Sequence, residues 1–166
     1  MEALGVDHID LTVSDLDRST AFYEKVLGAL GFRPVLNAAA RAPVAYNEHG
    51  VVFGSRFMTV GLYLAAPEER SIEFHRYRIG LHHLAFKARQ RADVDELHAF
   101  LVREGVSILE GGPAEYPQYA PGYYALFFAD PDGMKIEFVH CPSGYWRRVQ
   151  AEGHDERPRL ALAKDA

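Results

Sequence analysis

Two histidines, His8 and His83, stand near the start of two similar segments, GVDHIDLTVSDLDRSTAFYEKVLG and GLHHLAFKARQRADVDELHAFLVREG. An imidazole can ligate a metal ion or transfer a proton near neutral pH. Glu137 lies between Ile136 and Phe138 in an alternating run, so its carboxylate faces away from their apolar surface. A carboxylate that points into the concave side of a sheet is costly unless it is paired or metal-bound. The alternative for each histidine is a half-exposed strand residue without a chemical role.

The residues around each histidine predict a strand followed directly by a helix. The side chains alternate between apolar and polar after His8 and again after His83, as they do in a strand with one buried face. Apolar residues then recur at helical spacing in both segments. Ser14 and Asp17 offer oxygens for the N-cap of the first helix, and Asp93 with Glu96 is typical of a capping box at the second.

A short strand and a β-rich stretch follow each helix, so the chain reads as an internal repeat. The expected strands are 32–36, 51–54 and 58–65 in the first half, and 107–109, 123–129 and 135–140 in the second. The prediction is an α+β fold in which two βαβββ modules in one chain form a curled mixed sheet around a central cavity. One domain, 1–142, holds module one (about 4–70) and module two (about 79–142), and 143–166 is expected to be a partly disordered extension.

Composition narrows the range of partners. The chain has 166 residues, of which 48% are hydrophobic and 25% charged, and its formal net charge is −5. No dense run of Lys and Arg favours nucleic acid, and no apolar run reaches the roughly 20 residues that span a bilayer. We expect a cytoplasmic protein. Cys141 is the single cysteine, so the chain cannot form an internal disulfide.

The segments VDHIDLTVSDLDRSTAFYEKVLG, HHLAFKA and FFADPDGMKIEFVH together resemble the vicinal oxygen chelate superfamily. This superfamily includes glyoxalase I, extradiol dioxygenases, methylmalonyl-CoA epimerase and the fosfomycin and bleomycin resistance proteins. The resemblance covers about residues 6–142. It implies that paired modules enclose a cavity with a divalent metal between them, and that homodimers are possible because family members often pair modules across chains.

The resemblance assigns three metal ligands. His8 matches the ligand on the first strand of module one, His83 the equivalent ligand of module two, and Glu137 the carboxylate on the last strand. Two imidazoles and one carboxylate form a facial triad that suits Fe or Mn, and the same set with water suits Zn. The expected cofactor is a divalent ion, Fe, Zn, Mn or Ni.

Two positions depart from the family's patterns. Glyoxalase-type sites usually take a fourth ligand from the last strand of module one, where this chain has Gly61, Leu62 and Tyr63. Gly61 and Leu62 cannot ligate, and Tyr63 is a poor substitute. Extradiol dioxygenases carry a tyrosine where this chain has Phe127, and no histidine lies in the stretch 116–129.

Further candidates surround the expected ligands. Tyr63, His82, Tyr116 and Tyr123 are the candidates for catalysis, although strand parity predicts that His82 points away from His83 as a packed or supporting residue. Asp10 shares the face of His8 and could hold a supporting or substrate-binding position. Glu48 and His49 lie in the first long loop and could contact a substrate.

The leading hypothesis is a small metal-dependent enzyme of the glyoxalase type, a lyase or isomerase acting on a small molecule with two neighbouring oxygens. An extradiol-like ring-cleaving dioxygenase is the first alternative. A non-enzymatic protein that binds a drug or aromatic compound, of the bleomycin-resistance type, is the second.

Overall fold

The computed structural model describes residues 6–37, 50–55 and 58–142. The extension 143–166 and the loop residues Glu48 and His49 lie outside this part of the chain. The elements of module one are β1 (His8–Val13), α1 (Leu16–Ala29), β2 (Arg33–Asn37), β3 (Gly50–Gly54) and β4 (Thr59–Leu64). A linker with the short helix η2 (Pro67–Glu69) leads to β5 (Leu84–Lys87), α2 (Arg91–Arg103), β6 (Ile108–Glu115), β7 (Tyr124–Ala129) and β8 (Lys135–His140).

The strands form two four-stranded mixed sheets with the same topology, which confirms the α+β fold of two βαβββ modules. Their orders are β1-β4-β3-β2 and β5-β8-β7-β6. The first strand of each module pairs in parallel with the last, and the other neighbours are antiparallel. The sheets do not close into a barrel. β1 and β5 therefore each leave one edge without a neighbouring strand in these sheets.

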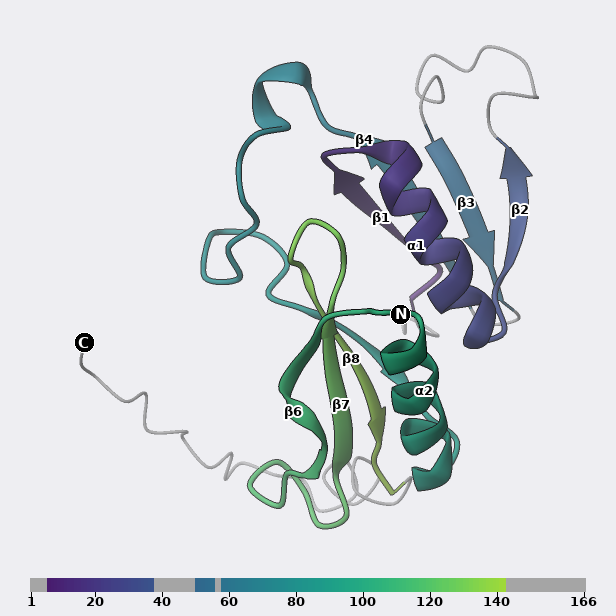
Figure 1. The fold of residues 1–166 in the computed structure, drawn as a ribbon, viewed down its shortest axis with the longest axis vertical. Helices are drawn as coiled ribbons and strands as arrows, with labels where there is room; N and C mark the ends of the chain where they lie inside the picture. Colours follow the sequence, from purple (N-terminus) through teal and green to yellow (C-terminus); the bar gives the residue numbers. More distant parts are fainter. Residues whose placement is uncertain (1–5, 38–49, 56–57, 143–166) are drawn as a thin grey trace, which may run out of the picture.

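The two helices lie on the same side of the molecule, and the linker crosses the other side (Figure 1). One hydrophobic core joins the modules on the helix side, where it includes Leu11, Tyr23, Leu62, Phe86 and Phe138. A second, smaller cluster lies on the opposite face of the second sheet. Side chains alternate along a strand, so the residues between the core positions of β7 and β8 point to this second face. Glu137 is one of them.

Polar contacts fix helix α1 against the turn between β7 and β8. The Tyr23 hydroxyl donates to Asp130 Oδ2 at 2.9 Å, and the Ser14 amide donates to Asp132 Oδ2 at 2.8 Å. Asp130 Oδ1 accepts from the backbone amides of Asp132 and Met134. The carboxylate thus connects module one to the DPDG turn of module two, a contact between residues far apart in the sequence.

Three local predictions were wrong. Asp15, not Ser14 or Asp17, caps α1, and the capping box of α2 consists of Gln90 and Asp93, so Glu96 has no part in it. Asp15 and Gln90 have the extended backbone that an N-cap residue requires. Strand β6 runs to Glu115, beyond the predicted 107–109, because a bulge between Leu109 and Ala114 lets the pairing with β7 resume.

We expect Tyr23→Phe to lower the free energy of unfolding by about 1–3 kcal/mol, since it leaves the buried Asp130 carboxylate without one donor. Burial raises the pKa of Asp130, and the Tyr23 hydrogen bond opposes that rise because it favours the ionised form. The penalty should therefore be full above the folded-state pKa of Asp130 and shrink as pH falls through it. Urea unfolding at several pH values measures it. A penalty independent of pH would contradict this account.

Candidate metal centre on the second sheet

Glu137 is the centre of the candidate site. It lies on β8 opposite Phe127 of β7, and only 2% of its surface is exposed. The Tyr123 hydroxyl donates to Glu137 Oε1 at 2.6 Å. His83 Nε2 lies 3.1 Å from Glu137 Oε2. The structure thus brings together two of the three predicted ligands, a nearly buried carboxylate and an imidazole that is 34% exposed.

Tyr123 acts as a hydrogen-bond donor in this arrangement. Burial raises its pKa, and the hydrogen bond to Glu137 raises that pKa further. The phenol therefore stays protonated at neutral pH and orients the Glu137 carboxylate. Its ring contacts Tyr119, with centroids 5.3 Å apart, within an aromatic group that also includes Tyr116 and Phe127.

His82 contacts His83 directly, with the two Nδ1 atoms 2.7 Å apart. The prediction from strand alternation that His82 points away from His83 was wrong, because β5 begins only at Leu84. Residues before the strand do not alternate as residues within it do. The pKa of His82 is lowered by desolvation and by the nearby His83, Arg76 and Lys135. A neutral His82 can accept a hydrogen bond from His83 Nδ1, which leaves His83 Nε2 to face Glu137.

His8 lies apart from the other two predicted ligands. It is at the start of β1, its side chain is 59% exposed, and Nδ1 lies 3.1 Å from Asp7 Oδ2. The hydrogen bond to Asp7 and the charge of Asp10 raise its pKa. Within residues 6–37, 50–55 and 58–142, no three His, Cys, Asp or Glu side chains are grouped as a metal site requires.

The remaining catalytic candidates divide between the two sheets. Tyr63 is on β4 of the first sheet, close to Gly61. Tyr116 follows β6 on the second sheet, where its hydroxyl donates to Glu110 at 3.3 Å and its ring meets Phe127 edge to face, with centroids 5.3 Å apart. Cys141 is buried in the same cluster as Phe127.

Lys135 and Glu110 form an ion pair on this face that was not predicted from the sequence. Lys135 is two residues before Glu137 on β8, and its ammonium lies 3.6 Å from the centroid of the Phe127 ring. Glu110 belongs to the β6 bulge and has a left-handed backbone with φ 55, like Gly111 and Gly112 after it. The hydrogen bond from Lys135 lowers the pKa of Glu110. The adjacent glycines of EGGP were the available signal, because they permit this bulge.

Two cavities border the linker. One of about 260 Å³ lies between linker residues 74–77 and the second sheet, and its wall includes Arg76, Leu109 and Lys135. A larger one, about 520 Å³, follows β1 and the linker and is lined by neither His83 nor Glu137. No helix in the described ranges is both long and apolar enough to cross a membrane.

Comparisons with known proteins agree with this fold. The chain is 31% identical over 159 residues to a 2-epi-5-epi-valiolone epimerase from an Actinomyces species, covering 86% of this chain and 82% of that protein. It is 29% identical to the metallothiol transferase FosB of Bacillus licheniformis, covering 96% and 88%. A solved glyoxalase-type structure from Bacillus halodurans, 30% identical, superposes with a TM-score of 0.66 over 82% of this chain and 95% of that one. The model of the Glyoxalase/Bleomycin resistance protein/Dioxygenase superfamily matches residues 5–138, and the chain belongs to this superfamily.

Proposed function

We propose that this protein is a metal-dependent lyase or isomerase that acts on a small molecule with two neighbouring oxygens. The observation that carries the proposal is the buried Glu137 carboxylate with His83 Nε2 at 3.1 Å. An ionised carboxylate is costly to bury without a counter-charge, and a divalent cation between Glu137 and His83 would supply one. The donor atoms, an imidazole nitrogen and carboxylate oxygens, suit Mn, Fe, Ni or Zn. The residues present therefore fit the ion.

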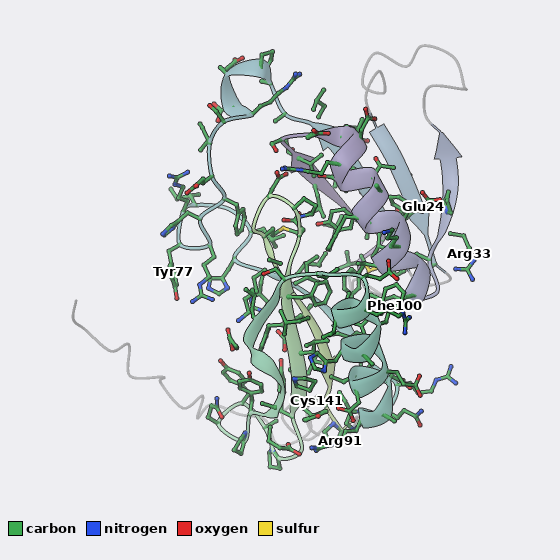
Figure 2. All side chains as sticks on the ribbon, in the orientation of Figure 1. Glu24, Arg33, Tyr77, Arg91, Phe100 and Cys141 are labelled. Carbon is green, nitrogen blue, oxygen red and sulfur yellow. The ribbon has the colours of Figure 1, made fainter. Side chains whose placement is uncertain are left out.

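His8 of a second copy of the chain completes the ligand set in this proposal. His8 is on the edge strand β1, and His83 directly precedes the edge strand β5. If β1 of one copy lies beside β5 of the other, the two histidines come close together. Large apolar side chains are exposed along the linker, which supports an interface there. They are Ile72, Tyr77, Ile79 and Leu81. Figure 2 shows Tyr77 on the linker, at the outer left side of the molecule.

The chemistry follows from the groups on the second sheet. A bound ion would act as a Lewis acid toward the two substrate oxygens and favour removal of a proton from the adjacent carbon. Tyr123 holds Glu137 in place. Glu110 lies on this face, paired with Lys135, and in this proposal its carboxylate takes the proton. Phe127 stands opposite Glu137, so the ring-cleaving reaction lacks the tyrosine that extradiol dioxygenases have there.

The test combines metal content with proton exchange. The protein purified without chelators, or reconstituted with Mn²⁺, Zn²⁺, Ni²⁺ or Fe²⁺, should contain about one ion per chain by elemental mass spectrometry. It should also exchange the proton next to the carbonyl of small hydroxy ketones for deuterium, measured by NMR, while apoprotein does not. His98→Ala, on helix α2, serves as a control. A protein that takes up no ion under any of these conditions would overturn the proposal.

We expect His82→Phe to weaken metal binding about tenfold, because outer partners of ligating histidines typically contribute 10–100-fold to affinity. The variant keeps an aromatic ring beside His83 but removes the nitrogen that holds His83 Nδ1. Titration with Mn²⁺ followed by electron paramagnetic resonance measures the change. His75→Phe, an exposed histidine of the same linker, is the matched control. Equal affinity in both variants would show that His82 does not orient His83.

Binding of an aromatic compound without chemistry is the second candidate. The Tyr116, Tyr119, Tyr123 and Phe127 rings contact one another on the face that holds Glu137. Aromatic surfaces of this kind favour flat apolar ligands. Calorimetric binding of such compounds to metal-free protein, with Tyr119→Ala weakening it, would favour this function over the enzyme.

A further inference from the structure

The Asp10 carboxylate lies directly over Gly61 on the first sheet. The two residues are paired across the parallel strands β1 and β4. A Cβ built on Gly61 would be 2.2 Å from Asp10 Oδ1 and 3.3 Å from Asp10 Cγ. Any larger residue at position 61 would therefore have to displace this carboxylate. The absence of a side chain on Gly61 is what allows Asp10 to occupy the space.

Each module has a carboxylate at the same place in its sheet, but a different strand supplies it. In module two, Ala85 of β5 pairs with Glu137 of β8, so the last strand carries the acid and the first strand a small residue. In module one, Asp10 of β1 pairs with Gly61 of β4, so the acid and the small residue have exchanged strands. In both modules a histidine lies two residues before the first-strand member of this pair: His8 begins β1, and His83 immediately precedes β5. Each module thus presents one imidazole and one carboxylate.

We propose that Asp10 is a fourth ligand of the metal ion, supplied together with His8 by the second copy. This inference rests on the proposed function, since it concerns the same ion. Asp10 shares the face of His8 because residues two apart on a strand point the same way. Asp10 thereby replaces the acid that position 61 of β4 does not provide.

A fourth ligand defines the substrate class. Two imidazoles and two carboxylates leave two positions on a six-coordinate ion, the number needed for two neighbouring substrate oxygens. The two carboxylates also balance the charge of a divalent ion. The site then favours a neutral hydroxy ketone or diol over a dianion such as a phosphonate, because Asp10 repels added negative charge.

The experiment is a double-mutant cycle on Mn²⁺ affinity, measured by electron paramagnetic resonance. Asp10→Ala should weaken Mn²⁺ binding at least tenfold, and Gly61→Ala should do the same because its methyl group displaces the carboxylate. The double variant, Asp10→Ala with Gly61→Ala, should bind no more weakly than Asp10→Ala alone. Water proton relaxation should report one more bound water on Mn²⁺ in the Asp10→Ala protein. Gly54→Ala is the matched control, since its Cβ would meet a Val35 methyl carbon at 2.3 Å in the same sheet, without a carboxylate.

The outcomes separate this inference from the proposed function. Wild-type affinity in Asp10→Ala, with His83→Ala binding no Mn²⁺, would overturn the role of Asp10 and leave the metal site intact. A wild-type protein that binds none of Mn²⁺, Zn²⁺, Ni²⁺ and Fe²⁺ would overturn both. Weakening in Gly54→Ala equal to that in Gly61→Ala would show that strain in the sheet, and not displacement of Asp10, causes the loss.

Discussion

Replacement of Glu137 by glutamine should reduce metal affinity at least 100-fold while the fold is retained. Glutamine keeps the size of the side chain and an oxygen that can accept from Tyr123, but it removes the negative charge. Its amide nitrogen cannot ligate the ion. Since Glu137 is 2% exposed, little solvent screening weakens the carboxylate's attraction for a cation.

The measurement is elemental analysis together with Mn²⁺ titration and urea unfolding of the metal-free protein. Glu115→Gln is the control, because this glutamate pairs with Arg91 and its side chain is 46% exposed. We expect metal-free Glu137→Gln to be at least as stable as metal-free wild type, since glutamine can still accept from Tyr123 and the variant no longer buries a charge whose partner, His83, is partly exposed. Wild-type metal content in Glu137→Gln would contradict the assignment of this residue as a ligand.

Mixing two inactive variants should restore metal binding if the site is shared between copies. His8→Ala and His83→Ala should each bind no ion alone. In a mixed dimer, one site combines the intact second sheet of the His8→Ala chain with His8 of the His83→Ala chain. Half of the dimers are mixed after random exchange, and each has one intact site of two, so about a quarter of the wild-type metal content should return.

The mixture must be unfolded and refolded together, or exchanged in dilute denaturant, so that the copies redistribute. Refolding each variant separately and then combining them is the control, and it should restore no metal before exchange occurs. Analytical ultracentrifugation checks that the wild-type protein is a dimer. Failure to recover metal from a co-refolded dimer would show that His8 does not complete the site across copies.

The repeat could be predicted from sequence because its signals are local. Alternation near His8 and His83 and helical spacing after each are properties of a few consecutive residues, and they gave both modules and the approximate strand limits. The alternation of side chains along β8 also predicted that Glu137 points to the face opposite its core-facing neighbour Phe138. His83 contacts Glu137 on this face. The same rule was wrong for His82 because the residue lies before the strand begins.

The sequence by itself determined the α+β fold, the two modules and the chemical character of the residues near Glu137. Only the tertiary structure decided which side chains meet. Tyr23 donates a hydrogen bond to Asp130, which lies 107 residues later in the sequence. The Asp10 side chain lies over Gly61 because β1 and β4 are parallel neighbours. Glu110 reaches Lys135 because of a bulge with left-handed backbone. These contacts depend on strand register and on packing between distant segments, and no local pattern of residue types encodes either.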